Sequence, residues 1–277
     1  MKKYLPYANY LAAAAGVAGA LLRWWTLSVG PDAKGLYPAA HPGWIGYLLL
    51  TAAAILALWL LTRSPEDAPK PLENFYLAFS STALTAAVHL LAAIGIALHA
   101  TRGSGLLQTV TYFLPLACAG GLTVLGLQIF SGKAPTGTVY LLPCVFFAMQ
   151  LFLFGKQYGN ETQLSLFMPQ ALAMAASSLA SYRLWGAAVG CDDRRKRLFW
   201  SLTAGFLSLA AAPGAHVMYA AVGLWHLAGH RILTPPETAA EAEEASEAIT
   251  EEATEEPIEE PIEEHTEEIP AEAETEE

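Results

Sequence analysis

Histidines are the side chains of this 277-residue chain whose spacing is best suited to chemistry. His89 and His216 fall at about the same depth, about 20 Å from the cytoplasmic ends of two predicted helices at 1.5 Å per residue. Two imidazoles at one depth on different helices could bind a metal ion or a haem iron between them. The alternative is that each ring is a hydrogen-bonded packing residue, and on that interpretation no cofactor is predicted.

A catalytic site is not predicted from the remaining residues. His226 and His230 are four residues apart and share a helix face, but without a neighbouring Glu or Cys this metal-binding pattern is incomplete. Intramembrane carboxylates usually mark coupled ion pathways. No Asp or Glu lies inside a predicted span, which disfavours a proton- or sodium-coupled carrier and leaves a facilitator or channel open. No catalytic residue is therefore assigned, and an enzyme is disfavoured.

Charge divides the chain into two parts. Nineteen of the 26 acidic residues lie between Glu237 and Glu277, so residues 1–234 carry a basic excess although the net charge is −11. We expect residues 1–234 to form a polytopic transmembrane domain and residues 235–277 a disordered, Glu-rich cytoplasmic tail, because the tail has too little apolar surface to fold. The basic block Arg194-Arg195-Lys196-Arg197, placed in a loop, is expected to contact anionic lipid or this tail.

Long apolar stretches predict the helices that position these residues. About 20 apolar residues are needed to cross roughly 30 Å of hydrocarbon. The predicted spans cover residues 7–28, 44–61, 75–98, 107–130, 139–154, 164–189, 198–212 and 215–232. Pro213-Gly214 favours a turn between the last two, whereas one kinked helix there would give seven spans. The predicted fold class is an all-α integral membrane protein, a bundle of about eight transmembrane helices with a disordered acidic C-terminal tail.

Basic residues predict the orientation of these spans. With both termini cytoplasmic, four of the 15 Lys and Arg residues fall outside and the other eleven inside, as expected for a cell membrane protein. Arg23 and Arg183 lie near span ends and are expected to extend to the membrane surface. Ala12, Gly16 and Ala20 repeat every four positions and are expected to pack against another helix.

Three short motifs near the start of the chain carry a family resemblance. They are Arg23-Trp24-Trp25, the loop Asp32-Ala33-Lys34-Gly35-Leu36 and His41-Pro42. They resemble an uncharacterised family of multi-pass membrane proteins from anaerobic Gram-positive bacteria. The resemblance covers the first two helices and their loop, and it implies no activity.

The sequence therefore predicts a non-enzymatic membrane protein, serving either small-solute passage or membrane assembly. The alternative is a membrane redox or metal- or haem-binding protein that uses the intramembrane histidines. The expected partners are the lipid bilayer and, through the basic block and the tail, an anionic lipid or a basic protein. No nucleic-acid partner is expected.

Overall fold

The computed structural model describes residues 8–30, 41–63, 82–100, 106–133, 136–158, 164–189, 191 and 193–229. The chain separates into two compact units, Met1–Pro235 and Pro236–Glu277, and all described residues belong to the first. The predicted disordered tail, His230 and the loop 31–40 that carries part of the family resemblance lie outside the described residues.

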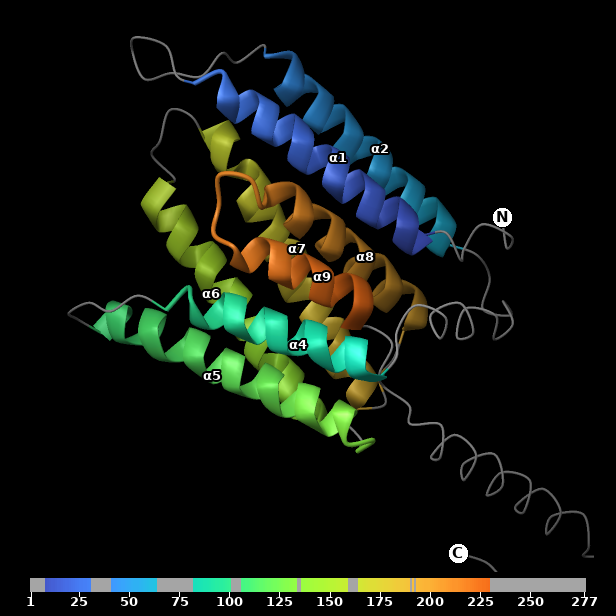
Figure 1. The fold of residues 1–277 in the computed structure, drawn as a ribbon, viewed down its shortest axis with the longest axis vertical. Coiled ribbons are helices and arrows are strands. Elements are labelled where there is room, and N and C mark those ends of the chain that lie inside the picture. Colours follow the sequence, from blue (N-terminus) through green and yellow to red (C-terminus); the bar gives the residue numbers. More distant parts are fainter. Residues whose placement is uncertain are drawn as a thin grey trace, which may run out of the picture. The chain divides into compact units, whose positions relative to one another are not determined.

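The described ranges are helical and contain no strand. Within these ranges eight α-helices follow one another, and a short 3-10 helix, η2 (Gly137–Tyr140), precedes the fifth of them. Figure 1 shows how the α-helices are arranged. The helices are α1 (Ala8–Ser28), α2 (Pro42–Thr62), α4 (Thr82–Ala97), α5 (Leu106–Phe130), α6 (Leu141–Tyr158), α7 (Leu164–Ala188), α8 (Arg194–Ala211) and α9 (Met218–Gly229). The prediction of an all-helical fold with eight helices is confirmed.

The break at Pro213-Gly214 separates two helices. α8 ends at Ala211 and α9 begins at Met218. Gly214 has a φ of +69°, in the left-handed region that side chains other than glycine rarely adopt. The prediction of a turn here is correct, and the single kinked helix is not formed. We call residues 212–217 the α8–α9 turn, and the end of the bundle that holds them the turn end.

The basic block was predicted in a loop, and this placement is wrong. Arg194 is the first residue of α8, so the block forms the first turn of that helix. Asp193 is the N-cap residue, and its carboxylate accepts a hydrogen bond from the backbone N–H of Lys196 at 3.1 Å. This bond satisfies a backbone donor that the first turn of a helix would otherwise leave free. The four consecutive basic residues suggested a loop, although Asp193 marks the start of a helix there.

Length and composition make several helices suitable for a membrane. In the described part of the chain, the segments Ala8–Ser28, Pro42–Thr62, Thr109–Phe130 and Gly137–Tyr158 are long and apolar enough to cross one. Shorter apolar helices cover Ala83–Ala97 and Met218–Ala228. Large apolar side chains are exposed on several helices, including Leu21, Leu49, Leu127 and Phe152. These apolar surfaces are compatible with contact with a lipid bilayer.

The α8 helix lies at the centre of the packing. It contacts α1, α2, α7 and α9, and nearly all its residues from Leu198 to Ala211 are buried. Glycines let the neighbouring helices approach closely: a Cβ on Gly19 would lie 2.8 Å from the Ala210 Cβ, and one on Gly223 would lie 2.8 Å from the Leu209 Cγ. Such contacts exclude any larger side chain at these positions.

The predicted packing residues of α1 are right in part. Ala12 is fully buried, and Gly16 packs against Leu209 and the Phe206 carbonyl of α8. Ala20 instead lines a groove on the surface, and Gly19 makes the close contact with α8. The buried face of α1 therefore follows the helical period of about 3.6 residues rather than a strict repeat of four.

Candidate functional site

Polar side chains gather in the interior of the bundle around α9. His89 of α4 is fully buried, and its Nδ1 lies 2.9 Å from the Thr85 carbonyl oxygen. Because a carbonyl only accepts hydrogen bonds, Nδ1 must carry the proton. In the neutral imidazole the other ring nitrogen, Nε2, is then a bare acceptor.

The ring beside His89 belongs to Trp225 of α9. Their centroids are 5.9 Å apart and the rings meet edge to face at 73°. Trp225 is also fully buried, and its Nε1–H can only donate. Within the described ranges, neither His89 Nε2 nor Trp225 Nε1 has a hydrogen-bond partner. His89 and Trp225 thus present a free acceptor and a free donor on neighbouring rings.

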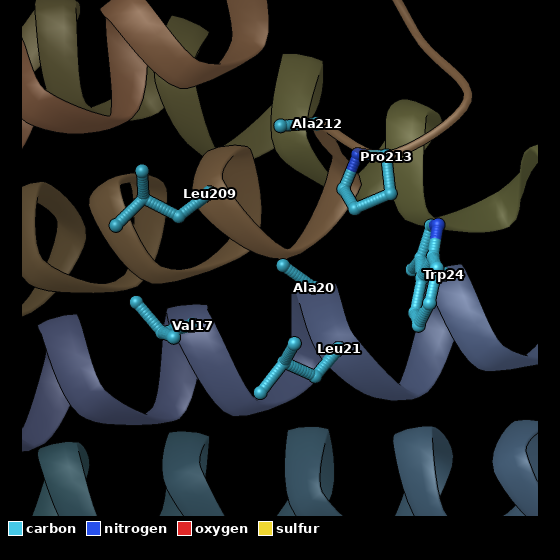
Figure 2. Close-up of a pocket in the computed structure, with 7 residues that line it drawn as sticks. All are labelled: Val17, Ala20, Leu21, Trp24, Leu209, Ala212 and Pro213. Atoms are coloured by element: carbon cyan, nitrogen blue, oxygen red, sulfur yellow. The ribbon is translucent and has the colours of Figure 1, made fainter.

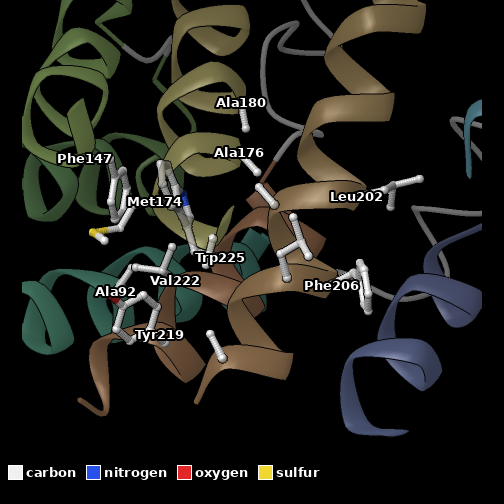
Figure 3. Packing of buried hydrophobic residues seen from close by; sticks show 14 of the residues in the cluster. Ala92, Phe147, Met174, Ala176, Ala180, Leu202, Phe206, Tyr219, Val222 and Trp225 are labelled. Atoms are coloured by element: carbon white, nitrogen blue, oxygen red, sulfur yellow. The ribbon is translucent and has the colours of Figure 1, made fainter. Parts of the chain in front are cut away.

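Hydroxyl groups are also buried on α7 and α8. Ser177 Oγ and Ser208 Oγ are 3.3 Å apart, and Ser181 Oγ donates to the Ser177 carbonyl at 2.8 Å. Ser201 is fully buried, and its hydroxyl has no partner in the described part of the chain. We call His89, Trp225, Ser177, Ser181, Ser201 and Ser208 the polar core. Figure 3 shows Trp225 among buried apolar side chains, together with Val222 and Tyr219 of the same helix.

A second histidine pair lies at the turn end. The ring beside His216 is that of His99, with centroids 5.1 Å apart. His216 Nδ1 accepts the backbone N–H of Met218 at 3.3 Å and so caps the start of α9, while His99 Nε2 lies 3.2 Å from Gln150 Oε1 of α6. These contacts join α4, α6 and α9.

The predicted metal pair, His89 and His216, is distributed over two different contacts: His89 lies against Trp225, and His216 lies against His99. The prediction of a common depth assumed that His216 lies inside the last helix. In the structure His216 lies in the turn before α9 begins. Among the described residues, no group of three or more His, Cys, Asp or Glu side chains could hold a metal ion. A metal-binding role for either histidine stays a prediction.

Arg23 is placed differently from the expectation that it would extend to the membrane surface. Its side chain is only 6% exposed, and its Nε donates to the Pro213 carbonyl at 2.8 Å. The guanidinium interacts electrostatically with Tyr47 and Tyr219. The reason is that the α8–α9 turn leaves carbonyl oxygens without helical partners, and Arg23 satisfies one of them. Through this hydrogen bond Arg23 therefore connects α1 to the α8–α9 turn.

The basic block at the opposite end is largely engaged within the bundle. Arg195 Nε donates to the Thr62 carbonyl at 3.3 Å and its Nη2 to the Arg63 carbonyl, which caps the end of α2. Lys196 Nζ lies 2.7 Å from Asp193 Oδ2, and hydrogen bonds from Lys196 lower the pKa of Asp193. Arg197 interacts electrostatically with Tyr140. The side chain of Arg194 lies outside the described residues.

An apolar groove of about 380 Å³ runs along the surface between α1 and α8. Figure 2 shows its lining of Val17, Ala20, Leu21, Trp24, Leu209, Ala212 and Pro213. With no polar side chain in that lining, the groove suits lipid chains rather than a polar ligand. It is separate from the polar core.

Comparisons with protein-family models, curated protein sequences and solved structures find no match to this chain. Sequence reasoning identified His89 as a candidate but missed Trp225, the serines of α7 and α8 and the buried position of Arg23. Their helical spacing is visible in the sequence, but their meeting depends on which helices become neighbours.

Acidification is expected to destabilise the turn end. Burial, opposed by the contact with Gln150 and assisted by nearby His216, lowers the pKa of His99. His99 therefore stabilises the fold fully above the ordinary histidine pKa of about 6.5, and this contribution is lost as the pH falls towards the lower pKa of the folded state. Thermal unfolding of the detergent-solubilised protein should show a smaller acid-induced loss of stability for His99→Gln than for wild type. An identical pH profile for both proteins would contradict this.

Proposed function

We propose that the protein is a non-enzymatic, multi-pass cell membrane protein whose polar core binds a small polar solute and lets it pass. The observation that carries the proposal is the pair of unpartnered, fully buried groups, His89 Nε2 and Trp225 Nε1. A buried polar group without a partner costs roughly 1–3 kcal/mol. One small molecule that both donates and accepts hydrogen bonds would satisfy the two groups together.

The position of the polar core supports passage as well as binding. Ser201 and Ser208 are seven residues apart on α8, about 10 Å along the helix at 1.5 Å per residue. The polar core therefore extends along the helix axes instead of being confined to one level. Pore-lining donors and acceptors of this kind are how membrane passages replace the hydration of a solute.

Solute flux through reconstituted protein tests this function. Vesicles containing wild-type protein should take up water, urea or glycerol faster than protein-free vesicles in stopped-flow light scattering. His89→Phe keeps a ring but removes the acceptor, so it should lower the flux several-fold. His41→Asn is the matched control, because His41 caps α2 through Nδ1 and Asn can cap as well. Flux equal in all three proteins and in protein-free vesicles would reject the proposal.

One observation favours the alternative of a metal- or haem-binding protein. The Nδ1–H of His89 donates to a backbone carbonyl, which is how metal-ligating histidines are commonly oriented. If His89 binds a cofactor, purified wild-type protein should contain stoichiometric metal or show a haem absorption band, and His89→Ala should remove it. Colourless, metal-free wild-type protein would end this alternative, and that is the result we expect.

The proposed topology has eight spans with both termini cytoplasmic. We expect a cysteine at Lys156, at the end of α6, to react with a membrane-impermeant thiol reagent on intact cells, and a cysteine in the tail to be protected. The background for both should carry Cys191→Ser, because Cys191 is exposed and would add to the labelling if the orientation were reversed. Labelling of the tail with protection of position 156 would reverse the proposed orientation, and labelling of both would favour seven spans.

A further inference from the structure

We infer that a solute reaches His89 and Trp225 by parting α4 from α9, so that the contact between these two helices is the gate of the proposed passage. This gate rests on the proposed passage and names the contact that regulates it. We call the contact the α4–α9 interface. It includes His89 and Gly95 of α4, and Met218, Ala221 and Trp225 of α9.

The two groups that would bind the solute lie on opposite sides of this interface. His89 Nε2 belongs to α4 and Trp225 Nε1 to α9, and both atoms are buried in this arrangement of the helices. A solute can therefore contact them only after the surrounding side chains move. Because the two ring centroids lie 5.9 Å apart across the interface, separating α4 from α9 directly widens the space between the rings.

The packing of α4 suits it to such a movement. Among the described elements α4 contacts only α5 and α9, and Figure 1 shows it between these two helices. On the α5 side the approach is close, because a Cβ on Gly126 would lie 3.2 Å from the Ala86 carbonyl oxygen and 3.2 Å from the His89 Cβ. Helices packed in this way move together when a protein opens, so α4 and α5 can leave α9 as one body.

The other side of the interface is held in place by α8. A Cβ on Gly223 of α9 would lie 2.8 Å from the Leu209 Cγ of α8. A Cβ on Gly205 of α8 would lie 2.6 Å from the Leu227 Cγ of α9. The α8–α9 turn also joins the two helices through the chain itself. We therefore expect α9 to stay with α8 while α4 moves away.

Opposing interactions give the α4–α9 interface two arrangements. Apolar packing favours the tight one, because Gly95 lets the helices approach until a Cβ there would lie 2.9 Å from the Ala221 Cβ. The nitrogens of His89 and Trp225, which have no partner among the described residues, favour the parted one, because an entering solute supplies their hydrogen bonds. A solute shifts the equilibrium towards the arrangement that it binds better.

A reversible disulfide across the α4–α9 interface tests this inference. Gly95→Cys with Ala221→Cys places two Cβ atoms 2.9 Å apart, and a small outward shift brings them to the separation of about 3.5–4.5 Å that a disulfide needs. The background carries Cys118→Ala, Cys144→Ser and Cys191→Ser, so that no other thiol competes. Oxidation should lower urea or glycerol flux into vesicles to the protein-free level, and a reductant should restore it.

Gly19→Cys with Ala210→Cys is the matched control, because the same two residue types meet at 2.8 Å between α1 and α8. Its oxidation, confirmed like the first by mass spectrometry, should leave the flux unchanged. Equal inhibition by both disulfides, or full flux through the oxidised α4–α9 pair, would overturn the gate and leave the proposed passage standing. Wild-type flux no higher than that of protein-free vesicles would overturn the passage and the gate with it.

A single substitution decides the inference if a cysteine pair does not fold. Gly95→Ala adds the Cβ that meets Ala221 and pushes α4 away from α9, so it should raise the solute flux above the wild-type level. Gly120→Ala is its control, because a Cβ there meets no atom within 4 Å, and its flux should equal that of wild type. A folded Gly95→Ala protein whose flux does not exceed that of Gly120→Ala would overturn the gate.

Discussion

Replacement of Gly19 by leucine is expected to destabilise the helical body by about 3 kcal/mol, the upper part of the range for overpacked cores. The Cβ alone would lie 2.8 Å from the Ala210 Cβ, and the rest of the leucine has no space between α1 and α8. Because α8 is the central helix, separating α1 from it also exposes buried apolar surface. Denaturant or thermal unfolding in detergent micelles measures the loss.

Gly120 of α5 provides the matched control for this substitution. A Cβ at Gly120 would meet no atom within 4 Å, so Gly120→Leu makes the same chemical change without a clash. We expect it to leave stability unchanged or to raise it slightly, because leucine favours helix more than glycine does. Equal effects at the two positions would show that α1 and α8 are not in close contact.

Trp225→Ala is expected to cost about 3–5 kcal/mol of stability, the range for removing a large buried aromatic side chain. Trp225 is fully buried among the core side chains of α4, α6 and α9. Trp225→Phe keeps most of the packing but lacks the N–H donor. It should therefore lose far less stability while lowering solute flux as strongly as His89→Phe does.

Trp24 is the control for Trp225, because its side chain is 64% exposed on α1. Trp24→Ala should change stability and flux little. If Trp225→Phe retains full solute flux while remaining folded, the indole donor has no part in passage. If Trp24→Ala is as damaging as Trp225→Ala, the assignment of buried and exposed faces is incorrect.

The helices could be predicted from the sequence because each depends on local patterns. Long apolar runs predicted the eight helices, and Pro213-Gly214 predicted the turn between the last two. Both patterns can be recognised because they depend only on residues close together in the sequence. The start of α8 was missed because four consecutive basic residues suggested a loop. Asp193 supplied the capping signal, but a single cap is a weak indication beside such a charge run.

The candidate site could be predicted only in part, because its contacts join distant parts of the chain. Arg23 and the Pro213 carbonyl are 190 residues apart, and no local pattern reveals that a carbonyl in a turn will accept that guanidinium. His89 was identified from its position in an apolar helix. Its contact with Trp225 depends on the packing of α4 against α9, which no local pattern in the sequence indicates.

The most direct test of the polar core is an experimental density map that resolves ordered water-sized molecules inside the bundle. We expect density for a small molecule within about 3 Å of both His89 Nε2 and Trp225 Nε1. We also expect His89 Nδ1 to lie within hydrogen-bond distance of the Thr85 carbonyl oxygen in that map. A map in which these two nitrogens contact only carbon atoms, or bond directly to other side chains, would contradict the proposal that the polar core binds a solute.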